Sequence, residues 1–197
     1  MKICVSLDTS VREAERVVEA LPRGTIYAVG WPLIVQKGGL ELIERMRREG
    51  CRIVWDLKLR DSPRAIGRII DTLPIHVSDM VSVWVEEEVL RCTTVRIGSR
   101  RLLGVLALPG QWDRVVEDVV QGAMTANEWG CSCLLCPKEF LEDVLMAGGQ
   151  TCIIELWSYP DAIKSEYVDV IVVGPEVTEA RDPAQAYKEL VVAGARE

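Results

Sequence analysis

Histidine is nearly missing from this 197-residue sequence, in which His76 is the only one. Nucleophilic catalysis by a Ser/His/Asp or a Cys/His arrangement would therefore depend entirely on that residue. His76 lies in the segment PIHVSD, ahead of an expected strand, so we interpret it as a surface or helix-packing residue. The sequence also lacks G-x-G-x-x-G and Walker-type strings, so these two phosphate-cradling loops are not expected.

Positive charge is in deficit as well. The 30 Asp and Glu residues outnumber the 23 Lys and Arg residues, and the formal net charge is -7. A nucleic-acid backbone would meet a mostly repulsive field, so we expect no nucleic-acid partner.

Long apolar runs are absent too. No stretch approaches the roughly 18 to 20 apolar residues that cross a bilayer. The first residues, MKICVSLDTS, have neither the apolar stretch nor the small-residue cleavage site of a signal peptide. We therefore expect no membrane contact and a cytoplasmic protein. With 49% hydrophobic residues and no linker or low-complexity tract, residues 1–197 are predicted to form one compact domain.

The seven cysteines do not have the even count or the density of a disulfide scaffold, so most are expected to be reduced thiols packed as small apolar residues. Cys131, Cys133 and Cys136 form C-x-C-x-x-C. No histidine or fourth cysteine lies nearby and the first two are expected on one strand face, so packing is favoured over a metal site. The excess of Arg over Lys, with Asn127 as the only asparagine, resembles a thermophile bias, although a high-GC genome would give the same excess of Arg.

Short runs rich in Val, Ile and Leu recur along the chain and predict eight strands. The runs are KICVSL (2–7), TIYAVG (25–30), CRIVWDL (51–57), DMVSVWV (79–85), RLLGVLAL (101–108), CSCLLC (131–136), TCIIELW (151–157) and DVIVVG (169–174). Amphipathic segments between them predict helices. Strict alternation requires parallel strands with right-handed crossovers, which leaves an open doubly wound sheet or a closed barrel. The count of eight favours a (β/α)8 TIM barrel.

In such a barrel, side chains that follow the carboxyl ends of the strands face a common mouth. Most strand ends here are apolar, and the polar exceptions are Asp8, the group Asp56, Lys58 and Asp61, and Glu155. These residues are the candidates for the chemistry of the protein.

The segment IVWDLKLRDSP at the end of the third strand is the most informative of these. The two-residue period of a strand places Asp56 and Lys58 on the interior face and Trp55 on the face that meets the helices. Two buried charges of opposite sign must pair, and a neighbouring carboxylate favours the ammonium form of a lysine. The pair is therefore either a structural ion pair that closes the mouth or part of a proton-transfer site.

The proton-transfer hypothesis assigns a role to each charge. Asp56 would repel a substrate carboxylate in the ground state, and Lys58 would protonate the carbanion left by its loss. Asp61 lies where the strand gives way to a loop, and Pro63 suits the first turn of the following helix.

The string D-x-K-x-x-D-x-P, formed by Asp56, Lys58, Asp61 and Pro63, resembles the signature of the orotidine 5'-phosphate decarboxylase superfamily, which also contains hexulose phosphate synthase and ketogulonate phosphate decarboxylase. The resemblance continues in SLDTS around Asp8, in VGWPLI (29–34), in SDMVSVWV and in VVGPEVTEARDPAQA (172–186). These segments follow the family's order along nearly the whole chain.

The resemblance implies a barrel that dimerises with the two mouths facing each other. It implies that Asp8 contacts a sugar hydroxyl, that Gly174 lies in the substrate-binding site, and that Asp61 reaches into the neighbouring subunit's site. The substrate would be a small phosphorylated metabolite, processed without a cofactor or metal, and the decarboxylase branch belongs to pyrimidine biosynthesis.

Departures from the family pattern concentrate on the substrate's phosphate and base. Ala28 stands where the decarboxylase has a lysine and the synthase branch a glutamate. Pro175, followed by the anionic Glu176, stands where an arginine helps to bind phosphate, and a proline offers no amide proton. The segment WSYPD, after the seventh strand, lacks the family's glycines, and Trp84 stands where a histidine is common.

Three hypotheses therefore remain. The first is a lyase that resembles orotidine 5'-phosphate decarboxylase. The second is a catalytically impaired paralogue that is retained for binding or interaction. The third is an aldolase of the hexulose phosphate synthase type with a divalent metal at Asp56, which Ala28 weakens.

Overall fold

The computed structural model describes residues 2–108, 115–147, 152–156 and 168–194. Its strands are β1 (Lys2–Ser6), β2 (Ile26–Val29), β3 (Arg52–Leu59), β4 (Met80–Trp84), β5 (Leu102–Val105), β6 (Cys133–Pro137), β7 (Cys152–Leu156) and β8 (Val170–Val173). Its helices are α1 (Val11–Ala20), α2 (Trp31–Ile34), α3 (Gly39–Arg48), α4 (Pro63–Thr72), α5 (Glu87–Ile97), α6 (Val116–Glu128), α7 (Leu141–Met146), α8 (Pro175–Thr178) and α9 (Pro183–Gly194). Short 3-10 turns lie at η1 (Ser99–Arg101) and η2 (Lys138–Phe140).

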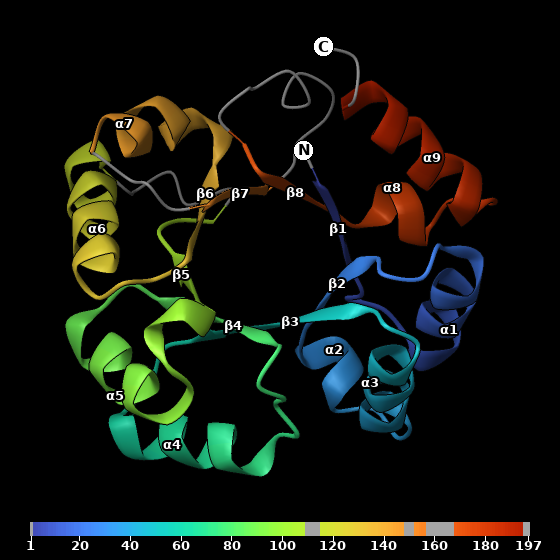
Figure 1. The fold of residues 1–197 in the computed structure, drawn as a ribbon, viewed down its shortest axis with the longest axis horizontal. Helices are drawn as coiled ribbons and strands as arrows, with labels where there is room; N and C mark the ends of the chain where they lie inside the picture. The colour runs from blue at the N-terminus through green and yellow to red at the C-terminus, as the bar shows by residue number, and fades with distance from the viewer. Residues whose placement is uncertain (1, 109–114, 148–151, 157–167, 195–197) are drawn as a thin grey trace.

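The strands pair in sequence order and all pairs are parallel, and β8 pairs in turn with β1, so the sheet closes on itself. Figure 1 shows the strands around the centre of the molecule and the helices outside them. The predicted α/β class with parallel strands is confirmed. Six strands lie within their predicted apolar runs, whereas β3 continues to Leu59 and β6 to Pro137, past the ends of theirs. Residues 157–167, between β7 and β8, lie outside the described part, so complete eightfold alternation stays a prediction.

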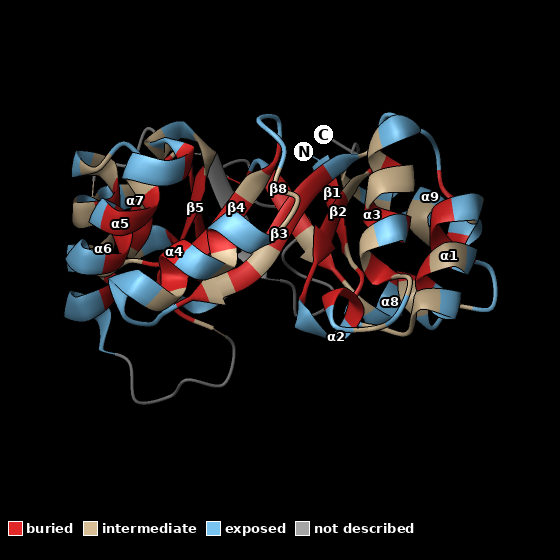
Figure 2. Ribbon diagram, turned by 90° about the horizontal axis from the view of Figure 1, so that it is seen from below, coloured by how far each residue is buried: buried red, intermediate tan, exposed pale blue. Residues whose placement is uncertain are grey.

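Two apolar layers explain why the strands read as continuous apolar runs, since parallel strands of this kind are covered on both faces. The inner layer fills the ring with Cys4, Ala28, Val54, Trp84, Leu103, Val105, Cys133, Leu135 and Val170. The outer layer lies between the sheet and the helices and includes Trp55, Tyr27 and Met46, all fully buried. Figure 2 shows this burial along the strands and on the inward faces of the helices.

Local sequence also sets where two helices begin. Ser10 and Glu13 form a capping box at the start of α1, in which each side chain bonds the other residue's backbone N–H. At α4, the hydroxyl of Ser62 accepts the backbone N–H of Ala65, and Pro63 occupies the first turn as predicted. Both helices therefore start at the carboxyl end of the sheet, one after β1 and one after β3.

The three cysteines of the C-x-C-x-x-C string lie on two sides of the sheet. Cys133 belongs to the inner layer, whereas Cys131 and Cys136 belong to the outer layer. The expectation that Cys131 and Cys133 share a strand face was wrong, because β6 begins only at Cys133. Within the described ranges no group of three or more His, Cys, Asp or Glu side chains is placed to hold a metal ion, and Cys4, Cys51, Cys92 and Cys131 are free thiols.

None of the helices in the described ranges combines the length and the apolar character that crossing a membrane requires.

A buried carboxylate ties the amino-terminal end of the sheet together. Asp79, 1% exposed, accepts hydrogen bonds from Arg47 Nη2 at 2.6 Å, from Trp55 Nε1 at 2.8 Å and from the backbone N–H of His76 at 2.9 Å. His76 itself is exposed at this end, opposite the mouth, as expected for a residue without a catalytic role. The network links α3, β3 and the segment that leads into β4.

We expect Asp79→Ala to lower the free energy of unfolding by about 3 to 5 kcal/mol, because it leaves Arg47 and the Trp55 indole without their buried acceptor. Urea denaturation followed by Trp fluorescence measures the change. Asp71→Ala is the matched control, since Asp71 makes only an exposed 3.9 Å contact with Arg96 and its loss should cost less than about 0.5 kcal/mol. Equal effects of the two substitutions would contradict a structural role for the network.

Candidate active site

The carboxyl ends of β1, β3 and β8 enclose a cavity of about 530 Å³. Its walls include Asp8, Asp56, Lys58 and Gly174, all of which were singled out from the sequence. Residues far apart along the chain meet here because neighbouring parallel strands end at the same edge of the sheet. Asp61, which was singled out as well, is not among the described lining residues.

Asp56 and Lys58 lie on the inward face of β3. The burial pattern of the strand alternates, with Trp55 and Leu57 buried against the outer layer and the two charged side chains only partly buried. Lys58 Nζ forms an ion pair with Asp56 Oδ2. The carboxylate side chain of Asp56 is 11% exposed and the Lys58 side chain 28%, so the ammonium is the member of the pair that faces the cavity more openly.

Ser82 on β4 fixes this pair from the neighbouring strand. Its hydroxyl accepts the backbone N–H of Lys58 at 2.8 Å and donates to Asp56 Oδ1 at 2.9 Å. Ser82 is fully buried. Both oxygens of Asp56 are thus occupied, one by the lysine and one by the serine.

The backbone of β3 departs from regular geometry at the lysine. Lys58 has φ 47°, the only positive φ among the described non-glycine residues, and the pairing of β3 with β4 shifts register between Trp55 and Leu59. The irregularity turns the Lys58 N–H toward Ser82 in place of a regular partner on β4. Sequence reasoning missed Ser82, and the available signal was a serine between Val81 and Val83 in an otherwise apolar strand.

Asp8 follows β1 and packs its carboxylate against Gly30. An ideal Cβ at Gly30 would lie 2.2 Å from Asp8 Oδ1, so the position after β2 has no room for a side chain. Partial burial of the carboxyl group, and secondarily the charge of Asp56, raise the pKa of Asp8, and the Lys58 ammonium opposes this rise. Asp8 and Asp56 therefore compete for the single positive charge of Lys58.

Gly174 ends β8 and precedes the short helix α8. Its backbone N–H donates to Glu176 Oε2 at 3.0 Å, so the glutamate side chain folds back onto the start of its own helix. Pro175, between them, has no N–H to offer. This amide is therefore engaged by a carboxylate of the same chain.

Asp61 lies outside the cavity, in the exposed segment between β3 and α4. Its carboxylate accepts the backbone N–H of the adjacent Ser62. A single chain does not bring Asp61 together with Asp56 and Lys58, and its predicted contribution to a neighbouring subunit stays a prediction.

The departures noted in the sequence are also placed by the structure. Ala28 is 3% exposed in the inner layer, where its register partners are Ser6 and Val54. Arg60 pairs through Nε with Glu86 at 2.7 Å and lies over the ring of Trp84, 5.5 Å from its centre. Arg60 is thus held at the rim by these contacts. The structure does not describe the side chain of Glu155, and the segment WSYPD lies outside the described residues.

A family model described as the orotidine 5'-phosphate decarboxylase / HUMPS family matches residues 1–85. A protein of Methylobacterium nodulans, described as orotidine 5'-phosphate decarboxylase, is 26% identical, and the match covers 96% of this chain and 94% of the relative. A protein of Halalkalibacterium halodurans with the same description is also 26% identical, over 94% of this chain and 95% of that protein.

Two solved structures share the fold. The crystal structure of orotidine 5'-phosphate decarboxylase from Lactobacillus acidophilus aligns with a TM-score of 0.81 and 20% identity, covering 98% of this chain and 99% of the other. An uncharacterized conserved protein from Geobacillus kaustophilus aligns with a TM-score of 0.79 and 24% identity over the same shares. These two likenesses establish the fold alone.

We expect Ser82→Ala to lower the free energy of unfolding by about 1 to 3 kcal/mol, because the Lys58 N–H and one oxygen of Asp56 lose a buried partner. Chemical denaturation measures the loss. Ser78→Ala is the control: Ser78 is exposed at the opposite end of the sheet and should change stability by less than about 0.5 kcal/mol. Unaltered stability of the Ser82 variant would mean that the serine does not hold the pair.

Asp8 gives a prediction about pH. Because folding raises its pKa, the ionised carboxylate disfavours the folded state at neutral pH, and the penalty disappears as pH falls below the ordinary carboxyl pKa. Asp8→Asn should therefore raise the free energy of unfolding slightly near pH 7 and leave it unchanged near pH 3. Denaturant titrations across this range test the sign, and a gain that grows toward acid pH would contradict it.

Proposed function

Since the chain is a divergent relative of the orotidine 5'-phosphate decarboxylase superfamily, we propose that it is a carbon-carbon lyase that decarboxylates a nucleotide-like carboxylate at the mouth of its sheet. The observation that carries the proposal is the ion pair of Lys58 with Asp56 inside the cavity. A protonated amine held beside a fixed carboxylate is the arrangement that this reaction needs.

The proposed reaction uses the two charges at different stages. Asp56 cannot move away from the substrate carboxylate, because both of its oxygens are bound by Lys58 and Ser82. The resulting repulsion is relieved when the carbon-carbon bond breaks, because the carboxylate group leaves as neutral carbon dioxide. The electron pair of that bond stays on the substrate carbon, and Lys58 Nζ gives it a proton. The Lys58 ammonium stabilises the negative charge while it develops.

The remaining residues are proposed to bind the substrate. Asp8, next to Lys58 at the cavity wall, would accept a hydrogen bond from a sugar hydroxyl, and Gly174 would contact the substrate's far end. Asp61 lies on an exposed segment, which suits a contribution to the site of a second copy in a homodimer. We also propose that the chain completes a single-domain (β/α)8 barrel and that it acts without a cofactor.

A binding or interaction protein derived from the same superfamily is the second candidate. Two observations favour it: Ala28 puts an apolar group where a further charge is expected, and the Glu176 carboxylate occupies the Gly174 amide. Neither observation touches Asp56 or Lys58, so the lyase remains the first proposal.

Incubation with orotidine 5'-phosphate, followed by the loss of ultraviolet absorbance, tests the lyase. Lys58→Ala should lower kcat at least about 100-fold, because it removes the proton donor. Lys188→Ala, on the outer face of α9, is the matched loss of one lysine and should keep the wild-type rate. Wild-type turnover no higher than that of Lys58→Ala, with orotidine 5'-phosphate and also with orotidine, would refute the proposal.

The same preparation separates the alternatives. Magnesium-dependent condensation of formaldehyde with ribulose phosphate would identify the aldolase. If neither reaction occurs and nucleotides or sugar phosphates still raise the melting temperature, the binding protein is supported.

A further inference from the structure

The described residues that line the cavity carry an excess of negative charge. Five carboxylates line it, from Asp8, Glu13, Asp56, Glu176 and Glu179, and Lys58 is the single cation among its described lining residues. That ammonium already pairs with Asp56. An anionic group that enters beside Gly174 therefore meets mostly carboxylates among these described residues, and these repel it.

Several backbone donors at this end of the cavity are already engaged as well. The Gly174 N–H donates to Glu176, and the N–H groups of Val177 and Thr178 donate back to the Gly174 carbonyl. At the start of α1, which also borders the cavity, the Ser10 N–H donates to Glu13. In other proteins, backbone amides at the start of a helix often bind an anion. Here these amides donate to carboxylates and carbonyls of the same chain.

Arg16, the nearby cation, is not among the described lining residues, and its hydrogen-bond donors are engaged outside the cavity. Its guanidinium reaches α8 from α1, but it donates to the carbonyl oxygens of Thr178 at 2.6 Å and of Ala180 at 3.0 Å. These bonds fasten the carboxyl-terminal end of α8 to α1. With that end of α8 fixed, Glu176 at the start of the same helix stays at the cavity wall.

We propose that Glu176 determines specificity: its carboxylate takes the place of a substrate phosphate at Gly174, so that the site prefers a substrate whose far end is uncharged. For the reaction proposed above, on which this inference rests, the preferred substrate is a nucleoside carboxylate and the phosphorylated form is the poorer one. Glu176 acts on the distant end of the substrate and leaves the chemistry to Asp56 and Lys58.

The test compares orotidine with orotidine 5'-phosphate, which differ only in the phosphate. The wild-type protein should have a kcat/KM for orotidine at least equal to that for the phosphate. Glu176→Gln removes the charge and should raise kcat/KM for orotidine 5'-phosphate about tenfold relative to orotidine. Glu176→Ala also frees the Gly174 amide and should raise it further.

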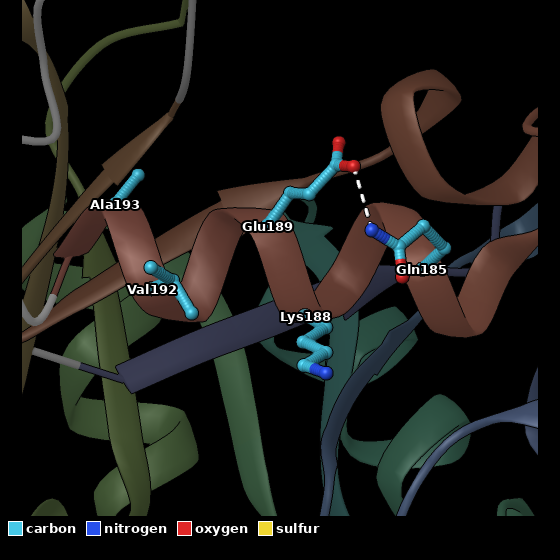
Figure 3. Close-up of a pocket in the computed structure, with 5 residues that line it drawn as sticks. All are labelled: Gln185, Lys188, Glu189, Val192 and Ala193. Carbon is cyan, nitrogen blue, oxygen red and sulfur yellow. Dashed lines mark hydrogen bonds between the residues drawn. The ribbon is translucent and has the colours of Figure 1, made fainter.

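Glu189→Gln is the matched control. Glu189 is an exposed glutamate on α9 that accepts a hydrogen bond from Gln185, and both line a separate shallow pocket on the outer face of the molecule (Figure 3). Its substitution changes net charge by the same amount and should leave the ratio of the two kcat/KM values unchanged. A wild-type preference for the phosphate above tenfold, or equal ratios in the Glu176 and Glu189 variants, would overturn the inference.

Binding of inorganic phosphate separates this inference from the proposed function, because it needs no turnover. Titration calorimetry at constant ionic strength should detect no saturable phosphate binding to the wild-type protein and saturable binding to Glu176→Ala. If neither orotidine nor its phosphate is decarboxylated, the lyase proposal fails, and this titration still decides the role of Glu176. Equal phosphate binding by both proteins rejects that role.

Discussion

The contact of Asp56 with Lys58 and Ser82 is the constraint on which the site depends. A carboxylate that is 11% exposed within a ring of parallel strands is costly unless each oxygen has a partner, and here the ammonium and the hydroxyl supply one each. Ser82 also accepts the Lys58 N–H, so a side chain of β4 holds both charged residues of β3 in position. The charged pair, the irregular backbone and the pairing of the two strands are therefore one arrangement.

Around this arrangement the two ends of the cavity have different character. The end near β3 has a compensated pair of charges and a buried serine, whereas the end near β8 is lined by the carboxylates of Glu176 and Glu179. The end near β3 is suited to holding and releasing a proton. The end near β8 is suited to recognising the part of the substrate that is distant from the reacting carbon. A family resemblance that is strong in D-x-K-x-x-D-x-P and weak after the last strand agrees with this separation.

Part of the site could be predicted from the sequence because it follows from local periodicity. The two-residue period of a strand places Asp56 and Lys58 on the same inward face, and the apolar runs predict the strands around them. The contacts of Ser82 and Asp79 join residues more than 20 positions apart, and no local pattern determines which side chain meets them. The back-folded Glu176 depends on the side-chain conformation that the end of β8 allows, which composition does not predict.

The left-handed backbone at Lys58 has an evolutionary consequence. A residue with a Cβ at φ 47° costs the folded chain about 1 kcal/mol, and a glycine would remove that cost together with the amine. The same glycine would also leave Asp56 Oδ2 without its ammonium partner, and an unpaired buried carboxylate costs more than the backbone strain. Replacing the lysine alone should therefore weaken the fold, so a lineage selected only for robustness is expected to change both members of the pair together.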